Sequence, residues 1–434
     1  MVLRGIFVNM KMLTKKIIIY ITAVLLTLSG CSHSSNNDHN KESDTPSSPS
    51  NALSQSEDNN QTESTEETSE LIEPLVEDNK NDELITNKIN SMSTEEKVAQ
   101  LFVVTPEALT GFNPVTQAYE GTKNAIDAIP VGGIIYMQQN LIDPYQTAEM
   151  LKNTYQYSME RIGLPIFLSV DEEGGGVTRV SKNPGFPNVP AILDMSYYGS
   201  LNNFQEAYDV GSLIGSYLHE LGFNLDFAPV ADVLTNSTNT VIGNRAFSSD
   251  VDIVANMALQ VAKGLESNNV YATYKHFPGH GGTADDTHEG YAYIDKTIEE
   301  LRETELVPFQ KGIDNGIQFM MIAHISLPNI LGDNTPASLS SYIITDLLRD
   351  EMGYKGLIIT DALNMGAITN SYSTADACLL SFQAGTDLLL LADNLNEGYN
   401  AILSAVYNGT ISEERLNASL ERILKIKYKM MDNE

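Results

Sequence analysis

The amino-acid sequence of 434 residues contains no tryptophan, and its two cysteines are Cys31 and Cys378. Because these cysteines lie far apart in unlike surroundings, they predict neither a disulfide framework nor a cysteine-based metal site. Basic residues are also scarce, since 26 Lys and Arg stand against 57 Asp and Glu, which gives a net charge of −31. Nucleic-acid phosphates are bound by clustered Lys and Arg, so this balance argues against a nucleic-acid partner.

Motifs for nucleotides and metals are missing as well. No GxGxxG follows the first expected strand, and no GxxxxGK followed by Ser or Thr occurs in the chain. His276, His280, Asp286 and His288 are residue types that bind zinc, but they show no HExxH or comparable ligand spacing. We therefore expect neither a metal nor another cofactor.

The apolar run near the N-terminus, residues 17–28, is shorter than the roughly 20 residues that a stable transmembrane helix needs. Lys and Arg residues precede it, as in a secretory signal peptide, and it leads into LSGC at residues 28–31. This tetrapeptide resembles the bacterial lipoprotein box, whose cysteine is lipidated. The resemblance implies a signal peptide at 1–30 and a lipidated Cys31 that anchors an extracytoplasmic protein to the cell membrane. An ordinary signal peptide or a short anchor is the alternative.

Residues 31–84 consist mainly of Ser, Asn, Thr, Asp and Glu. Such a segment cannot bury enough apolar surface to offset its chain entropy, so we expect a disordered acidic linker. Much of the negative charge belongs to this linker and therefore says little about what the folded part binds.

In residues 85–434, apolar runs alternate with amphipathic segments. The expected strands are Gln100–Val104, Gly132–Met137, Pro165–Val170, Asn224–Ala228, Val270–Tyr274, Gln318–Ala323, Gly356–Thr360 and Asp387–Leu391. The expected helices are Ala118–Ala128, Pro144–Ile162, Asn203–Leu221, Val251–Ser267, Ile298–Asp314, Ser340–Met352, Asn396–Tyr407 and Ser412–Met431. Strands that alternate with helices in this way predict one α/β domain folded as a (β/α)8 TIM barrel. An open, doubly wound sheet is the alternative.

Charged side chains follow five of the expected strands at the point where each strand ends. In chain order these residues are Asp171 and Arg179, Asp232 and Arg245, Lys275 and His276, His324, and Asp361. In a barrel the carboxyl ends of the strands converge on one face, where barrel enzymes place their chemistry. Charged residues after a single strand can be a coincidence, but charged residues after five strands favour a functional site. Asp226 lies inside its strand, and we expect it to be a structural hydrogen-bonding residue.

The stretch Tyr274–Gly290, YKHFPGHGGTADDTHEG, is dense in titratable groups and glycine. Because glycine tolerates sharp bends, we interpret its second half as a mobile loop hinged at Gly281 and Gly282. This loop carries Asp286 and His288, whose two-residue spacing lets the carboxylate orient the imidazole and stabilise its protonated form.

These residues can act together in bond cleavage. A carboxylate such as Asp361 can bond to an electrophilic carbon, and an imidazole such as that of His288 can give a proton and take one back. This division of labour is that of retaining glycoside cleavage. Five further residues are then candidates to hydrogen-bond sugar hydroxyls: Asp171, Arg179, Arg245, Lys275 and His276. For Lys275 and His276, an ion pair in the barrel mouth is the alternative.

Four segments, DEEGGGVTR, GNRAFSSD, KHFPGHGGTADDTH and TDALNMGA, resemble motifs of glycoside hydrolase family 3, most closely its β-N-acetylhexosaminidase branch. The resemblance covers about residues 90–430. It implies a retaining double displacement on terminal β-linked N-acetylglucosamine. By carry-over, Asp361 is the nucleophile, His288 is the acid/base with Asp286 as its partner, and the five residues listed above bind substrate.

Some residues depart from the family pattern. Glu172 and Gly176 stand where Gln and Arg are more frequent, and Thr287 stands where Ser is usual. Because the chain has no tryptophan, an aromatic platform under the sugar must be Tyr or Phe, or Met takes its place.

Three functions therefore remain open from the sequence. The first, which we favour, is a lipid-anchored exo-β-N-acetylhexosaminidase that acts on peptidoglycan fragments or related glycans. The second is a phosphorylase that uses the same residues with phosphate in place of water. The third is a non-catalytic lipoprotein that binds glycans.

Overall fold

The structure is a computed structural model that describes residues 73–283 and 292–432. The predicted signal peptide at 1–30, Cys31 and most of the predicted linker lie outside the described residues, and so do Asp286 and His288. The predictions for those segments therefore stay predictions.

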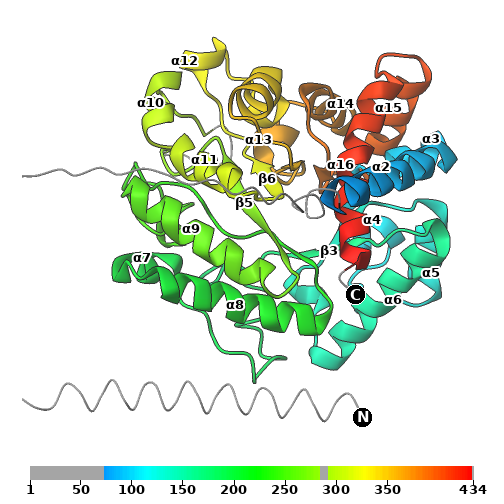
Figure 1. The fold of residues 1–434 in the computed structure, drawn as a ribbon, viewed down its shortest axis with the longest axis horizontal. Coiled ribbons are helices and arrows are strands. Elements are labelled where there is room, and N and C mark those ends of the chain that lie inside the picture. The colour runs from blue at the N-terminus through cyan, green and yellow to red at the C-terminus, as the bar shows by residue number, and fades with distance from the viewer. Residues whose placement is uncertain (1–72, 284–291, 433–434) are drawn as a thin grey trace, which may run out of the picture. The chain divides into compact units, whose positions relative to one another are not determined.

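Eight parallel strands form one sheet in the order β7-β6-β5-β4-β3-β2-β1-β8, and helices surround it (Figure 1). The strands are β1 (Phe102–Val104), β2 (Gly133–Ile135), β3 (Phe167–Val170), β4 (Leu225–Asp226), β5 (Tyr271–Phe277), β6 (Phe319–Ile322), β7 (Leu357–Thr360) and β8 (Leu389–Leu390). A bridge between Ile359 and Leu388 joins β7 to β8 and closes the ring. The predicted (β/α)8 barrel is confirmed, and the open sheet is wrong.

Long helices follow the strands, largely where the sequence predicts them. They are α5 (Glu120–Ala128), α6 (Pro144–Ile162), α8 (Phe204–Leu221), α9 (Val251–Glu266), α14 (Thr374–Ala384), α15 (Leu395–Tyr407) and α16 (Glu413–Asp432). Shorter helices are α3 (Thr94–Ala99), α4 (Pro106–Thr110), α7 (Met195–Leu201), α12 (Pro328–Leu331) and α13 (Gly366–Thr369). The segment Tyr342–Glu351 is wound as a π-helix inside the predicted Ser340–Met352 helix.

Two predicted boundaries are wrong. The helix expected over Ile298–Asp314 is split into α10 (Ile298–Glu303) and α11 (Leu306–Asp314). Pro308 explains the break, because proline lacks the N–H that a continuous helix would need there but is tolerated in a first turn. The predicted disordered linker also ends early, since residues 73–84 belong to helix α2 (Glu73–Ser91). This helix packs against α16 and buries Ile85 and Ile89, which are four residues apart on one face.

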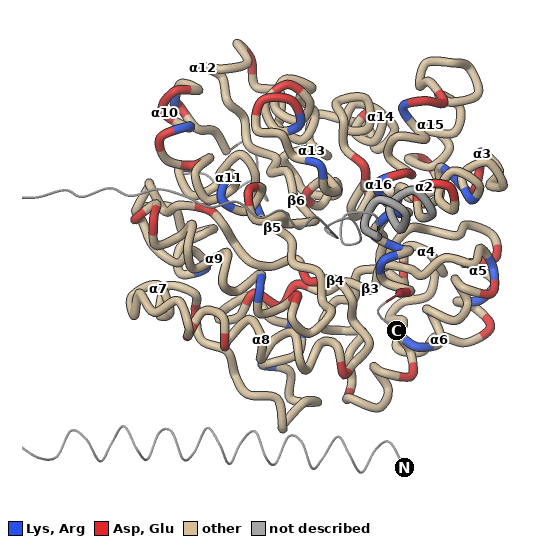
Figure 2. The backbone as a smooth tube through the Cα atoms, viewed as in Figure 1, with Lys and Arg blue, Asp and Glu red and all other residues tan. Residues whose placement is uncertain are grey.

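The surface carries charges of both signs. Lys and Arg positions are scattered among Asp and Glu over the described part of the chain (Figure 2). Within that part, no helix combines the length and apolar character needed to cross a bilayer.

A buried lysine lies at the amino-terminal end of the barrel. Lys427 of α16 donates to Oε1 of Gln100 at 2.8 Å and to the carbonyl of Gly132 at 3.0 Å, and its ammonium lies 5.0 Å from the centre of the Phe167 ring. Within the described part of the chain, no carboxylate offsets the cost of removing this cation from water, and burial lowers the pKa of Lys427 to about 7.

This lysine predicts that the protein becomes more stable as the pH rises from 7 to 9. The unfolded chain keeps Lys427 protonated up to its ordinary pKa near 10.5, whereas the folded chain has already released the proton, so raising the pH favours folding. From pH 7 to pH 9 the gain is about 2 kcal/mol. Urea unfolding at both pH values measures it, with Lys427→Met as the control that lacks the gain. Equal pH dependence in the two proteins would contradict the prediction.

Candidate active site

The predicted site residues that the structure describes line one cavity of about 360 Å³ at the carboxyl ends of the strands. They are Asp171, Arg179, Arg245, Lys275, His276 and Asp361. The volume lies near the lower end of the range for small-molecule sites, about 300–1,000 Å³. One prediction needs correction, because Lys275 and His276 lie inside β5, which extends to Phe277, rather than after it.

Ion pairs hold the cations of this cavity in place. Lys275 Nζ lies 2.6 Å from Oε1 of Glu173 and 3.1 Å from Oδ1 of Asp171. Arg245 donates to both oxygens of Glu173, each at 2.8 Å. Arg179 Nη2 lies 3.3 Å from Oδ2 of Asp171. Lys275 therefore forms the ion pairs that were the alternative interpretation. These ion pairs also hold in place the side chains that were predicted to bind a sugar.

Glu173 is the centre of this network, and the sequence interpretation assigned it no role. Its carboxylate is almost completely buried. Burial alone would raise the pKa of Glu173, but Arg245 and Lys275 outweigh it and hold this pKa far below the usual range. The carboxylate therefore stays ionised at every pH at which the protein is expected to work.

Asp232 fixes the orientation of the His276 ring. Its buried carboxylate lies 2.7 Å from Nδ1 of His276 and accepts the backbone N–H of His280 at 2.5 Å. Burial raises the pKa of Asp232, but His276 and the backbone amide lower it more, so the group is ionised. An ionised Asp232 accepts the Nδ1 proton, which leaves Nε2 of His276 facing Arg245 Nη2 at 3.3 Å.

Asp361 follows β7, where the backbone fixes it at the cavity wall. Its N–H donates to the carbonyl of Ile322 at 2.9 Å, and its Oδ1 accepts the N–H of Ala362 at 2.7 Å. Burial raises the pKa of Asp361, whereas His276, His324 and the Ala362 amide lower it below its ordinary value. The residue is therefore a carboxylate near neutral pH, as a nucleophile must be.

His324 supports this turn, although its strand-end position gave it no assigned role in the sequence. Its Nε2 lies 2.9 Å from the carbonyl of Ala362, and its Nδ1 lies 2.7 Å from the Ser338 hydroxyl. Burial lowers the pKa of His324, although the Asp361 charge acts in the opposite direction. Because a carbonyl oxygen only accepts, Nε2–H donates to Ala362. This arrangement ties the residue after Asp361 to β6.

Glu172 does not reach the cavity, yet it organises one wall. Its buried carboxylate accepts the backbone N–H groups of Arg179 at 2.6 Å, Val180 at 2.9 Å and Ser181 at 2.8 Å, and the Tyr217 hydroxyl at 2.9 Å. These contacts place the segment that carries Arg179 beside Asp171. The departure from the family pattern at Glu172 thus has a structural use.

We expect Glu172→Gln to destabilise the protein by about 2 kcal/mol, because a carboxamide has one acceptor oxygen and would turn an NH₂ toward the remaining donors. The Arg179 segment should loosen, so KM should rise more than kcat falls. Urea unfolding and steady-state kinetics measure both effects, and the exposed Glu299→Gln serves as the matched control. Wild-type KM and stability in Glu172→Gln would refute the role.

Asp226 behaves as predicted for a structural residue. Its Oδ1 accepts the N–H of Glu172 at 2.9 Å from within the barrel. Burial, with the nearby Glu172 charge, raises the pKa of Asp226 well above its ordinary value, although the Glu172 amide acts in the opposite direction. Asp226 therefore fixes the backbone at Glu172 from inside the barrel, as expected for a structural residue.

The predicted glycine hinge is not supported where the structure describes it. A Cβ on Gly281 would lie 2.1 Å from the carbonyl oxygen of Val233, so Gly281 is glycine because two backbones approach closely. Of the glycines nearby, Gly279 has a positive φ, of 125°. Alanine at Gly281 would therefore disturb packing rather than test loop motion.

His280 is one of the residues whose side chains are of a type that binds zinc. It is buried, and burial, together with the neighbouring His276, lowers the pKa of His280 to about 4, while Asp232 partly opposes this. Among residues 73–283 and 292–432, no group of three or more His, Cys, Asp and Glu is placed to hold a metal ion.

The site therefore consists of an aspartate at the end of β7 and ion-paired Lys and Arg side chains, at the carboxyl ends of the strands of a closed (β/α)8 barrel. Residues 93–426 match the model of the glycosyl hydrolase family 3 N-terminal domain. The chain belongs to this family.

Two curated relatives and one solved structure illustrate the similarity. Beta-hexosaminidase A of Pseudoalteromonas piscicida is 33% identical over 328 residues, which are 70% of this chain and 54% of that protein. The beta-hexosaminidase of Nitrosomonas eutropha is 32% identical over 61% of this chain and 74% of its own length. A family 3 beta-N-acetylglucosaminidase from Paenibacillus sp. superposes with a TM-score of 0.73 at 35% identity, over 79% of this chain and 64% of that one. The match thus spans about half of the first relative.

Proposed function

We propose that the protein is a retaining exo-β-N-acetylhexosaminidase that removes terminal β-linked N-acetylglucosamine. The observation that carries this proposal is the ionised Asp361, held at the wall of a monosaccharide-sized cavity opposite fixed Lys and Arg side chains. Membership of family 3, with several relatives named beta-hexosaminidase, supports the choice of sugar.

The reaction proceeds in two displacements. In the first, an Asp361 oxygen bonds to the anomeric carbon, the glycosidic C–O bond breaks, and the leaving oxygen takes a proton from His288. In the second, water bonds to the same carbon and returns a proton to His288, and the bond to Asp361 breaks. Asp286 orients His288. Both residues lie outside the described part of the chain, so their roles rest on the sequence motif.

The cations and acids of the cavity bind the sugar. Lys275, Arg245 and Arg179 present N–H groups whose positions the carboxylates of Asp171 and Glu173 fix before the substrate arrives. Because these groups need little rearrangement on binding, more of the binding energy is available to stabilise the transition state.

A chromogenic β-N-acetylglucosaminide tests the proposal. The protein should hydrolyse it, release free N-acetylglucosamine of retained configuration, and act far more slowly on the matching β-glucoside. Assays with and without phosphate distinguish the phosphorylase, because sugar 1-phosphate would then replace the free sugar as product. Binding of the sugar without turnover of any β-hexosaminide would favour the non-catalytic glycan-binding protein.

We further propose that the natural substrates are peptidoglycan fragments or related glycans and that lipid on Cys31 anchors the enzyme outside the cell membrane. The LSGC sequence at 28–31 supports the anchor. Metabolic labelling with palmitate should mark the wild-type protein and leave Cys31→Ser unlabelled. Equal labelling of both proteins would remove the lipid anchor from the proposal.

A further inference from the structure

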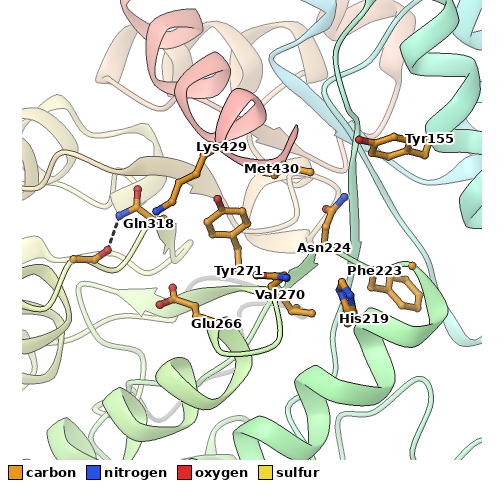
Figure 3. Close-up of a pocket in the computed structure, with 13 residues that line it drawn as sticks. Tyr155, His219, Phe223, Asn224, Glu266, Val270, Tyr271, Gln318, Lys429 and Met430 are labelled. Carbon is orange, nitrogen blue, oxygen red and sulfur yellow. Dashed lines mark hydrogen bonds between the residues drawn. The ribbon is translucent and has the colours of Figure 1, made fainter. Parts of the chain in front are cut away.

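A second cavity, of about 290 Å³, lies at the amino-terminal ends of the strands (Figure 3), whereas Asp361 follows the carboxyl end of β7. Its wall includes the residues that immediately precede three strands, namely Asn224 before β4, Val270 before β5 and Gln318 just before β6. Residues of α16 close one side of it. None of its lining residues takes part in the proposed glycosidase chemistry.

Three helices end at this basal cavity. They are α8, α9 and α11, and the cavity is lined by Gly222, Asn269 and Gly316, which follow their last turns. A helix carries a partial negative charge of roughly half an elementary charge at its C-terminus. The three helix ends therefore favour a cation in the cavity and disfavour an anion.

Two polar atoms of the cavity wall are buried without a hydrogen-bond partner. They are Oε1 of Glu266, at the end of α9, and the hydroxyl oxygen of Tyr271, at the start of β5. Because an unsatisfied buried polar atom is unfavourable, a ligand that bonds both atoms gains free energy at each of them. Burial raises the pKa of Glu266 to about 7, which shows how incompletely its negative charge is balanced.

The cavity already has a cation at its edge. Lys429 of α16 extends beside Tyr271 (Figure 3) and is exposed to solvent. It lowers the pKa of Glu266 through charge alone, without a hydrogen bond to the carboxylate. A free ammonium ligand would bind beside the Glu266 carboxylate, on which the Lys429 ammonium already acts by its charge.

We infer that this basal cavity binds a small organic ammonium ion. The ammonium N–H groups would donate to Oε1 of Glu266 and to the hydroxyl oxygen of Tyr271, which are the two unpartnered acceptors. The aromatic ring of Tyr271 and the side chain of Phe223 provide apolar surface for the alkyl part. This inference is independent of the proposed glycosidase activity, because none of these residues lines the active-site cavity.

Calorimetric titration of the full chain with n-butylammonium chloride tests the inference, with 1-butanol as the neutral ligand of similar shape. We expect one ammonium per chain and at least about tenfold weaker binding of 1-butanol, which lacks the charge. Glu266→Gln should lose at least about tenfold in affinity, and Lys429→Met should bind more tightly because the competing cation is gone. The exposed Glu299→Gln is the matched control and should bind as the wild type does.

The affinity should also depend on pH. The ammonium binds the ionised form of Glu266, so binding strengthens as the pH rises through about 7 and is roughly tenfold tighter at pH 8 than at pH 6. The other charged or titratable groups around Glu266 are Lys263 on its own helix, Tyr271 and Tyr274 on β5, Lys429 on α16, Tyr354, and His219 across the cavity. The titration is therefore repeated in His219→Gln, which should keep the same pH dependence.

Several results would overturn the inference. Equal affinity for 1-butanol and n-butylammonium would mean an apolar cavity without an ammonium site. Wild-type affinity in Glu266→Gln, or absence of binding in both the wild type and Lys429→Met at 50 mM ligand, would do the same. If Glu266→Gln fails to fold, Tyr271→Phe removes the second acceptor and should weaken binding; unchanged binding there would also refute the site.

Discussion

Replacing Asp361 with alanine should lower kcat on a chromogenic β-N-acetylglucosaminide by about 10⁴-fold, which corresponds to about 5.4 kcal/mol of activation free energy. In the proposed reaction the carboxylate bonds to the anomeric carbon and balances its developing positive charge, and the other two described acids of the cavity wall, Asp171 and Glu173, are already paired with Lys275. Steady-state kinetics measure the loss. Retention of more than about one percent of wild-type turnover would remove Asp361 from the nucleophile's role.

Two controls separate lost chemistry from lost structure. Asp361→Asn keeps the shape of the side chain and an oxygen for the Ala362 N–H, and it should be nearly as inactive as Asp361→Ala because it lacks the charge. Azide fits the space that alanine leaves and should partly restore cleavage in Asp361→Ala with formation of a glycosyl azide. Absence of any azide product in a folded Asp361→Ala would count against direct attack at the anomeric carbon.

Glu173→Gln should give the second-largest effect. It removes the charge that fixes both Lys275 and Arg245 and leaves two buried cations with Asp171 as the remaining acid in contact with Lys275. Breaking a buried pair from one side costs about 3–5 kcal/mol of stability. We also expect kcat/KM to fall by about 10²- to 10³-fold, because the sugar-binding cations lose their fixed positions.

A double-mutant cycle tests whether charge balance is the cause. In Glu173→Gln/Lys275→Met the number of buried charges is again balanced, so the free energy of unfolding should partly recover. Activity should not recover, since Lys275 itself is expected to contact the sugar. If the double variant is as unstable as the sum of the two single variants, the ion-pair explanation fails.

Local sequence pattern was sufficient for the barrel and for part of the site. Charged residues follow five of the apolar runs that were expected to be strands, and the fold rule for barrels then brings Asp171, Lys275 and Asp361 together. For these three residues, the position relative to the end of a single strand was enough to predict a place in the site. Where two elements pack against each other, as α2 does on α16, the pattern of one segment did not reveal the contact.

The supporting residues were harder to find because their roles depend on what lies across the barrel. Asp232 acts by contacting the ring of His276. Glu172 acts by accepting three backbone N–H groups and the hydroxyl of Tyr217. Glu173 did carry a local signal, since in extended chain residues two apart point to the same side, as Asp171 and Glu173 do here. Glu172, between them, points away from the cavity.

The paired charges of the active-site cavity have a further consequence for how substrates arrive. Among the described residues, Asp171, Glu173 and Asp361 are matched there by Arg179, Arg245 and Lys275, so these six side chains contribute little net field although the chain carries −31 overall. An uncharged sugar therefore reaches the site at a rate that ionic strength barely changes. A glycan fragment with free carboxylates instead meets the repulsion of the whole acidic chain, and salt shortens the reach of that repulsion to about 8 Å at 0.15 M.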